Sequence, residues 1–291
     1  MNHPKLITAL ALVACAPTVQ QPIAELTKEE RLEIQDRKQS QEAADKVAEI
    51  RAAVTEEAKR LGPDHWAGSY YYGDGMGVNV SLSIAPEAGF AFEWHGCMGL
   101  YDRNYGAIEQ VDGLLHLSLT FHNSRKGFQG IDESFRPILW GERQHLVAQE
   151  QMIEFCNAVN QGSSGHNTLV KRSESMKEVF GVPNVPSELL PYLLKNPVRA
   201  EIIGVGETTL CPSVCEWFFH ETEVTLNVGA DQGVLVGMEF NLTDPDKLES
   251  AMVQQVFKDS CIAVVSRIDD DEKPAVGWKL WTGSPFSWLQ D

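Results

Sequence analysis

The sequence is short of positive charge, of long apolar runs and of recognisable catalytic motifs. Lys and Arg number 24 against 41 Asp and Glu, which gives a net charge of -17. Such a surface repels nucleic-acid phosphates, so we expect no nucleic-acid partner. No run of about 20 apolar residues is present, which argues against a bilayer-spanning helix. No G-x-S-x-G, Walker, S-x-x-K or H-E-x-x-H pattern occurs, so the sequence favours a protein that is not an enzyme and has no cofactor or metal.

The length of 291 residues suits two small domains and a connector, and 43% apolar residues are enough for packed cores. We expect a mainly β (α+β) fold with a helical N-terminal stalk, an antiparallel meander or barrel-like domain and a second small β-barrel. The expected segments are a signal peptide (1–14), a lipid tether (15–26), the stalk (27–62), the meander with its closing helix (64–165), a linker with short helices (166–198) and the small barrel (199–284).

The head of the chain has the layout of a secretory signal. One lysine, Lys5, precedes a nine-residue apolar run, Leu6–Ala14, which ends at Cys15. Leu12-Val13-Ala14-Cys15 resembles the lipobox of bacterial lipoproteins. The resemblance implies cleavage before Cys15 after export by the Sec route, with a diacylglycerol on the Cys15 sulfur and an acyl chain, such as palmitate, on the new amine. An ordinary cleaved signal with a stray cysteine is one alternative, and a cytoplasmic start with an apolar helix is another.

The residue after the lipid-bearing cysteine helps to decide whether a lipoprotein stays in the inner membrane or is moved to the outer membrane. In enteric-type lipoproteins an aspartate there favours retention in the inner membrane, and this chain has Ala16. The resemblance therefore implies a lipid-anchored protein of the outer membrane that faces the periplasm. Two or more acyl chains make such attachment lasting.

A long helix is predicted next. Thr27 and Glu30 form a capping box and Gly62 is a stop signal, with no Gly or Pro between. One face carries apolar residues at spacings of three and four: Val47, Ile50, Val54, Ala58 and Leu61. We expect this face to dock on the chain's own globular domain, and a coiled-coil seam is the alternative.

The following region reads as an antiparallel meander. Asp112-Gly113 suits a type I′ hairpin turn, and Leu115, Leu117 and Leu119 alternate as in a half-buried strand. Two further strands are expected around Gly141, followed by a helix that begins near Met152 and ends at Gly162.

The cluster with the most reactive side chains consists of Glu93, His95 and Cys97, which share one face if the segment is a strand. A carboxylate, an imidazole and a thiol could form a catalytic Cys–His pair or bind a metal, so they are candidates for catalytic residues. The alternative is an ordinary surface face with Cys97 in a disulfide.

Glycines mark the last region. Asn227, Gly229, Gly233, Gly237 and Met238 match the pattern vnxGxxxGvxxGM, which is similar to that of small C-terminal β-barrels in rod-shape-determining protein C and flagellar assembly T protein. The chain departs from their closing aspartate at Gly277-Trp278. In those families the module docks other proteins or itself, so the resemblance implies a protein partner in the cell envelope.

Five cysteines remain after Cys15. Export would place them in an oxidising compartment, so we expect disulfides, with Cys211–Cys215 and Cys97–Cys156 as plausible pairs and Cys261 left over. The sequence as a whole predicts a lipid-anchored envelope protein that binds or organises other components. A carrier that holds a small hydrophobic ligand in the first meander is one alternative, and an exported hydrolase is another.

Overall fold

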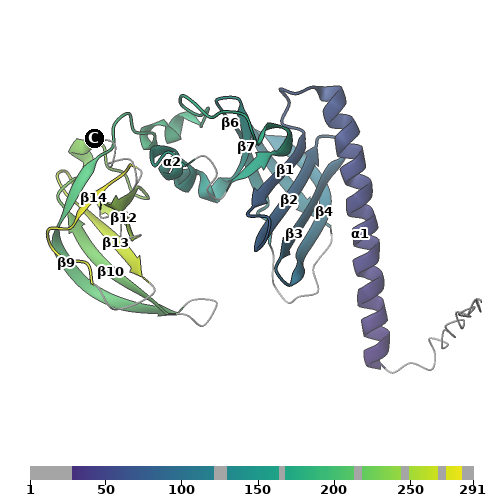
Figure 1. The fold of residues 1–291 in the computed structure, drawn as a ribbon, viewed down its shortest axis with the longest axis horizontal. Helices are drawn as coiled ribbons and strands as arrows, with labels where there is room; N and C mark the ends of the chain where they lie inside the picture. The colour runs from purple at the N-terminus through teal and green to yellow at the C-terminus, as the bar shows by residue number, and fades with distance from the viewer. Residues whose placement is uncertain are drawn as a thin grey trace, which may run out of the picture. The chain divides into compact units, whose positions relative to one another are not determined.

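The computed structural model describes residues 28–120, 130–163, 168–212, 218–243, 249–267 and 273–283 (Figure 1). It confirms a mainly β fold with an N-terminal helix and two closed antiparallel barrels. The helices are α1 (Lys28–Leu61) and α2 (Met152–Asn160), with 3₁₀ turns at Gln149–Gln151, Arg172–Glu174, Ser187–Tyr192 and Ala230–Gln232. Within these ranges, neither helix has an apolar stretch long enough to cross a membrane.

The first barrel has eight strands paired in chain order. They are β1 (Gly68–Gly73), β2 (Val78–Ala85), β3 (Gly89–Gly96), β4 (Gly99–Val111), β5 (Leu114–Leu119), β6 (Ser134–Trp140), β7 (Arg143–Ala148) and β8 (Leu169–Lys171). Three expected features are confirmed: the hairpin at Asp112-Gly113, where both residues have positive φ, the turn at Gly141, and the closing helix α2.

The first barrel extends beyond its expected limit. It closes where β1 pairs with β8 through Tyr70↔Lys171 and Tyr71↔Val170. The strand β8 lies in the segment that we expected to be a linker from residue 166. Three residues are too few to show strand periodicity, so sequence pattern alone does not reveal this strand.

Side chains fill the interior of the first barrel. Tyr70, Phe90 and Phe92 are at most 1% exposed and point inward, as do Leu82, Leu115 and Leu146. The Tyr70 hydroxyl donates a 2.6 Å hydrogen bond to the carbonyl oxygen of Trp66, which satisfies its only polar atom. The barrel is therefore a packed core, and space for a ligand must be sought at its two ends.

The C-terminal part of α1 packs on the outside of the first barrel, along β1–β4 (Figure 1). Ala43, Val47, Ile50 and Val54 are buried there. The predicted docking on the chain's own domain is thus confirmed, and the coiled-coil alternative is wrong for this face because the barrel already covers it. The part of α1 up to Glu42 belongs to a separate unit from the rest of the chain, and in that part Lys38 and Glu42 make an exposed i,i+4 ion pair.

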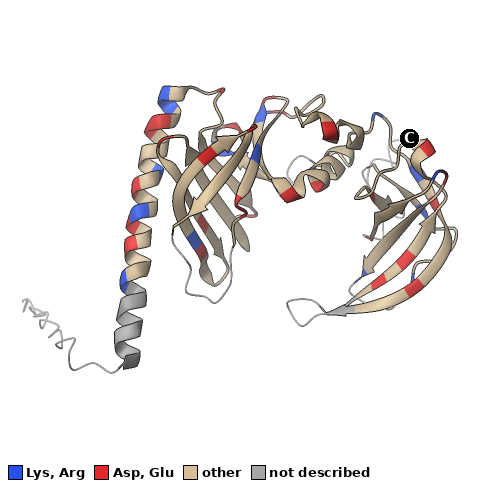
Figure 2. Cartoon of the chain, turned by 180° about the vertical axis from the view of Figure 1, so that it is seen from behind, with Lys and Arg blue, Asp and Glu red and all other residues tan. Residues whose placement is uncertain are grey.

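A buried carboxylate also fixes this part of α1. Glu57 is 6% exposed and accepts hydrogen bonds from the backbone N–H groups of Glu87 (3.0 Å) and Ala88 (2.8 Å), in the turn between β2 and β3. The helix therefore caps a hairpin turn of the barrel. Elsewhere along α1, lysine and arginine alternate with glutamate on the exposed side (Figure 2).

The second barrel has six strands, in the order β10-β13-β12-β11-β14-β9. They are β9 (Arg199–Pro212), β10 (Phe218–Leu226), β11 (Glu239–Leu242), β12 (Ser250–Val256), β13 (Cys261–Arg267) and β14 (Lys279–Trp281). Phe240, Leu226 and Val265 are among the residues that fill it.

Three glycines of the last region lie in turns or close contacts of this barrel. Gly233 and Gly237 have φ of +77° and +85°, and a Cβ on Gly229 would lie 2.4 Å from the Phe257 carbonyl oxygen. Acidic residues are part of the strands of this barrel, where β9 includes Glu201 and β10 includes Glu223, and the ribbon of this barrel carries red segments (Figure 2).

Candidate functional site

Glu93 is held in an ionic cluster on the outer face of β3. Its Oε2 accepts from Arg51 Nη1 at 2.7 Å, and its Oε1 accepts from Arg103 Nε at 2.8 Å. Burial alone would raise the pKa of Glu93, but Arg51 and then Arg103 hold this pKa below its ordinary value. Glu93 is therefore an ionised carboxylate with both oxygens engaged, and it ties α1 to the barrel.

Of the other two members of the predicted cluster, His95 shares a face of β3 with Glu93, and Cys97 lies beyond the end of that strand. The β2–β3 pairing is continuous from Ala85↔Gly89 to Val78↔Gly96, so Glu93 and His95 lie on the same face of β3, where the side chain of His95 is exposed. Cys97 is exposed in the turn after β3, with its Sγ 3.6 Å from Tyr101 Oη. The described part of the chain holds no group of three His, Cys, Asp or Glu side chains placed to bind a metal.

The expected Cys97–Cys156 disulfide is wrong. Cys97 is exposed at a turn, whereas Cys156 lies on the buried face of α2 in the same cluster as Trp140 and Phe155, and both thiols are free. Spacing in the sequence does not report this separation. Cys261 is also free and buried, as expected. The Cys211–Cys215 pair and Cys15 lie outside the residues whose side chains the structure describes.

Thiol labelling checks these assignments. We expect iodoacetamide at pH 8 to modify Cys97 in the folded chain and to leave Cys156 and Cys261 unmodified, since burial raises the pKa of both thiols to about 11. All three should react after unfolding in guanidinium. Peptide mass spectrometry reads each site, and a Cys97–Cys156 cross-linked peptide from unreduced protein would contradict the structure.

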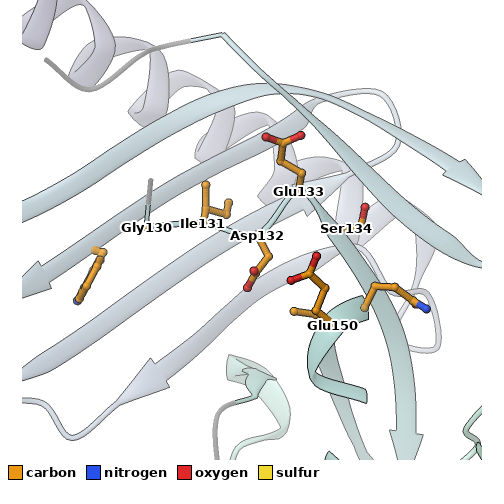
Figure 3. A pocket seen from close by; sticks show the side chains of 9 residues that line it. Gly130, Ile131, Asp132, Glu133, Ser134 and Glu150 are labelled. Atoms are coloured by element: carbon orange, nitrogen blue, oxygen red, sulfur yellow. The ribbon is translucent and has the colours of Figure 1, made fainter. Parts of the chain in front are cut away.

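One cavity lies at the end of the first barrel near Trp94, with a volume of about 630 Å³ (Figure 3). Ile131, Asp132 and Glu133 line it from the segment before β6, and Glu150 lines it from the segment after β7. The carboxylates of Asp132 and Glu150 point toward one another in Figure 3. Burial and then the charge of Glu150 raise the pKa of Asp132. This end of the barrel, which we name the acidic mouth, would disfavour anionic ligands.

A second cavity of about 760 Å³ lies at the opposite end, where β4 ends and β7 begins. We name it the amide mouth, after Gln110, Gln144 and Asn184, whose side chains line it. The other lining residues are Pro63, Asp64, Trp66, Gly113, Arg136, Pro137, Leu139, Gly141, Glu142, Glu174, Lys177, Val185 and Pro186. Strand pairing puts Gln110, Gln144 and Leu139 on the inward face of the barrel, because they share faces with buried Leu115 and Phe135.

A buried lysine, Lys171, contacts three residues that line the amide mouth, namely Pro63, Gln144 and Glu174. Lys171 Nζ donates to the carbonyl oxygens of Pro63 (3.0 Å) and His65 (2.7 Å) and lies 3.9 Å from Glu174 Oε1. Burial lowers the pKa of Lys171, and the nearby charge of Glu174 opposes this shift. The Glu174 carboxylate also accepts from the backbone N–H of Gln144 at 2.7 Å. These contacts give the cavity a rigid base where β8 closes the barrel.

Sequence reasoning missed both mouths. Gln110 follows the apolar face of β4, and Gln144 stands two residues before buried Leu146, so strict alternation would have placed both inward. The loop residues Lys177 and Asn184, by contrast, carry no signal of their position, because the turns of the segment after β8 bring them to the barrel.

The chain was compared with protein-family models, with curated proteins and with solved structures. None of these comparisons gives a match. The function is therefore argued from the residues of this chain.

Proposed function

We propose that the protein is a lipid-anchored component of the cell envelope with a non-catalytic binding or scaffolding role. The observation that carries this proposal is that the apolar run Leu6–Ala14 ends in Leu12-Val13-Ala14-Cys15, which resembles a lipobox. A diacylglycerol on Cys15, with a further acyl chain on its amine, would attach the chain lastingly to a membrane. Ala16, where an aspartate would retain the protein in the inner membrane, favours the periplasmic face of the outer membrane.

Two features support a binding role over a catalytic one. Glu93, the carboxylate of the candidate cluster, has both oxygens engaged by arginines, and in the described part of the chain it forms no hydrogen bond with His95 or Cys97. Both cavities of the first barrel are at its open ends, where barrels commonly hold ligands. The similarity of the second barrel to envelope docking modules also favours a protein partner. A hydrophobic-ligand carrier gains less support, because the interior of the first barrel is filled by Tyr70, Phe90 and Phe92.

The anchor is tested by replacing Cys15 with alanine. We expect the native protein to sediment with membranes and to need detergent for release, and the C15A chain to keep its signal segment or to be released in soluble form. Mass spectrometry of the N-terminal peptide should show acyl chains on Cys15 of the native protein.

Cys97→Ala is the matched control, because it removes another thiol of the chain at an exposed turn. This variant should remain acylated and bound to the membrane. Recovery of native protein with an unmodified Cys15, or with a first residue other than Cys15, would overturn the proposal.

A further inference from the structure

The three amide side chains of the amide mouth have fixed orientations. The Gln110 Oε1 accepts from the Trp66 indole N–H (3.2 Å), the Asn184 Oδ1 from the backbone N–H of Leu139 (2.5 Å), and the Gln144 Oε1 from Lys171 Nζ (3.4 Å). Indole, backbone N–H and ammonium groups only donate hydrogen bonds. In each pair the atom facing the donor must therefore be the oxygen, so no assignment of amide flips is involved.

This arrangement leaves the amide nitrogens as unused donors at the cavity. Within the described ranges, the side-chain nitrogens of Gln110, Gln144 and Asn184 form no hydrogen bond. The guanidinium of Arg136, which also lines the cavity, has a buried Nε that has no partner in the same part of the chain. A ligand that supplies several acceptor oxygens would satisfy these donors.

The charges of the lining argue against an anion. Two positive side chains, Arg136 and Lys177, are accompanied by three carboxylates, those of Asp64, Glu142 and Glu174. Lys177 is itself 3.6 Å from Glu174. The free donors are thus mainly uncharged amides, which suit neutral carbonyl oxygens better than phosphate or carboxylate.

The remaining lining is apolar and adds no side-chain acceptor to the three carboxylates, of which that of Glu174 is already engaged by the Gln144 N–H, Lys171 and Lys177. Its apolar side chains include those of Pro63, Pro137, Pro186 and Val185, and that of Leu139, which is 48% exposed. An ordinary peptide would bring one N–H for each carbonyl, and each buried N–H would need an acceptor. Proline has carbonyl oxygens and no N–H, and a proline-rich segment is pre-ordered in the extended polyproline conformation.

We propose that the amide mouth binds a proline-rich segment of a partner polypeptide through its main-chain carbonyl oxygens. The proposal names a partner class for the binding role above and rests on that role. Exposed Phe180 and Val182 extend the apolar surface beside the cavity, because Phe180 packs on Gly141 in its lining. Proline rings that emerge from the cavity would contact this surface.

The test is a titration of the purified full-length chain, in detergent, with a blocked fluorescent decaproline peptide, followed by fluorescence anisotropy. Gln110→Glu and Asn184→Asp are close to isosteric. Each keeps the oxygen that accepts from Trp66 or Leu139 and replaces the free donor with a carboxylate oxygen. We expect each variant to weaken binding about tenfold or more, and the double variant to abolish it.

Gln149→Glu is the matched control, since it introduces the same charge at the acidic mouth. This variant should bind decaproline as the native chain does, and unfolding midpoints of all variants check that the fold is retained. Binding of a blocked Gly-Ser decamer as tight as that of decaproline would overturn the proposal, as would equal losses in the Q149E and N184D variants. Saturable binding of a chitin tetrasaccharide that is lost in N184D, without binding of decaproline, would also overturn it.

The lipid anchor and the peptide site are tested by different experiments, so each can be refuted without the other. The titration is done in detergent solution and does not depend on membrane attachment, so the C15A chain should bind decaproline with unchanged affinity. Loss of peptide binding with an acylated Cys15 would refute only the peptide site, and an unmodified Cys15 with intact peptide binding would refute only the anchor.

Discussion

Replacement of Val54 by aspartate is expected to detach α1 from the first barrel and to lower the free energy of unfolding by about 3 kcal/mol or more. Val54 is fully buried between α1 and the barrel, in the same cluster as Val47 and Ile50. The variant loses the apolar burial of one side chain and places an unpaired carboxylate where water does not reach. Urea unfolding followed by tryptophan fluorescence measures the change.

Ala53→Asp is the matched control for this prediction, because it introduces the same charge one residue away on the exposed side of α1. Its free energy of unfolding should stay within about 0.5 kcal/mol of the native value. Detachment of α1 from the barrel is measured separately by limited digestion with trypsin. Trypsin should cut after Arg51 faster in V54D than in A53D. Equal stability and equal digestion of the two variants would show that α1 is not docked through Val54.

The second large effect concerns pH and His145, which is fully buried between the first barrel and α2. Its Nδ1 lies 3.0 Å from Thr168 Oγ1, and its Nε2 is buried without a partner among the described residues. Burial, and then the positive charge of Arg143, lowers the pKa of His145 to about 4. The ring is therefore neutral in the folded protein at pH 7, packed against Trp140 and Phe155.

The sign of the pH effect follows from this lowered pKa. The unfolded chain binds the proton near pH 6.5 and the folded chain only near pH 4, so acidification favours unfolding across this interval. The stability that His145 contributes is complete above pH 6.5 and falls as the pH decreases toward 4. We expect the protonation of His145 alone to lower the free energy of unfolding by about 2 kcal/mol when the pH is decreased from 7 to 5.

The measurement compares urea unfolding at pH 7 and pH 5 for the native chain and for His145→Gln, which does not titrate. Between pH 7 and pH 5 the free energy of unfolding of the native chain should decrease by about 2 kcal/mol more than that of the variant. His116→Gln is the control, since His116 is only half-buried and has Ser134 beside its ring at 3.1 Å. A pH dependence of H145Q equal to that of the native chain would contradict a neutral buried His145.

The sequence predicts those parts of the fold that depend on local chemistry. The Asp112-Gly113 turn, the glycines of the second barrel and the apolar face of α1 were each predictable, because φ preference and side-chain period act over a few residues. The β8 strand was not, since its three residues are a strand only through pairing with β1 and β7.

The site depends on contacts between distant residues, and local patterns do not report these. Glu93 was singled out as a chemical group, but its partner Arg51 lies 42 residues earlier, on a helix. The amide mouth joins Gln110 to Asn184 across several strands. Its donors become visible only once Trp66 and Leu139 are seen to take the amide oxygens.

The closure of the first barrel by β8 sets an order of folding during synthesis. The strand that pairs with β1 ends at Lys171, about a hundred residues after β1, so the barrel stays open on a ribosome until that segment has emerged. Until then β1 and β7 each have an unpaired edge, which exposes the nascent chain to wrong strand pairing. Chain termination before residue 169 would thus leave a sheet that can pair with its neighbours, although all residues of α1 and β1–β7 would be present.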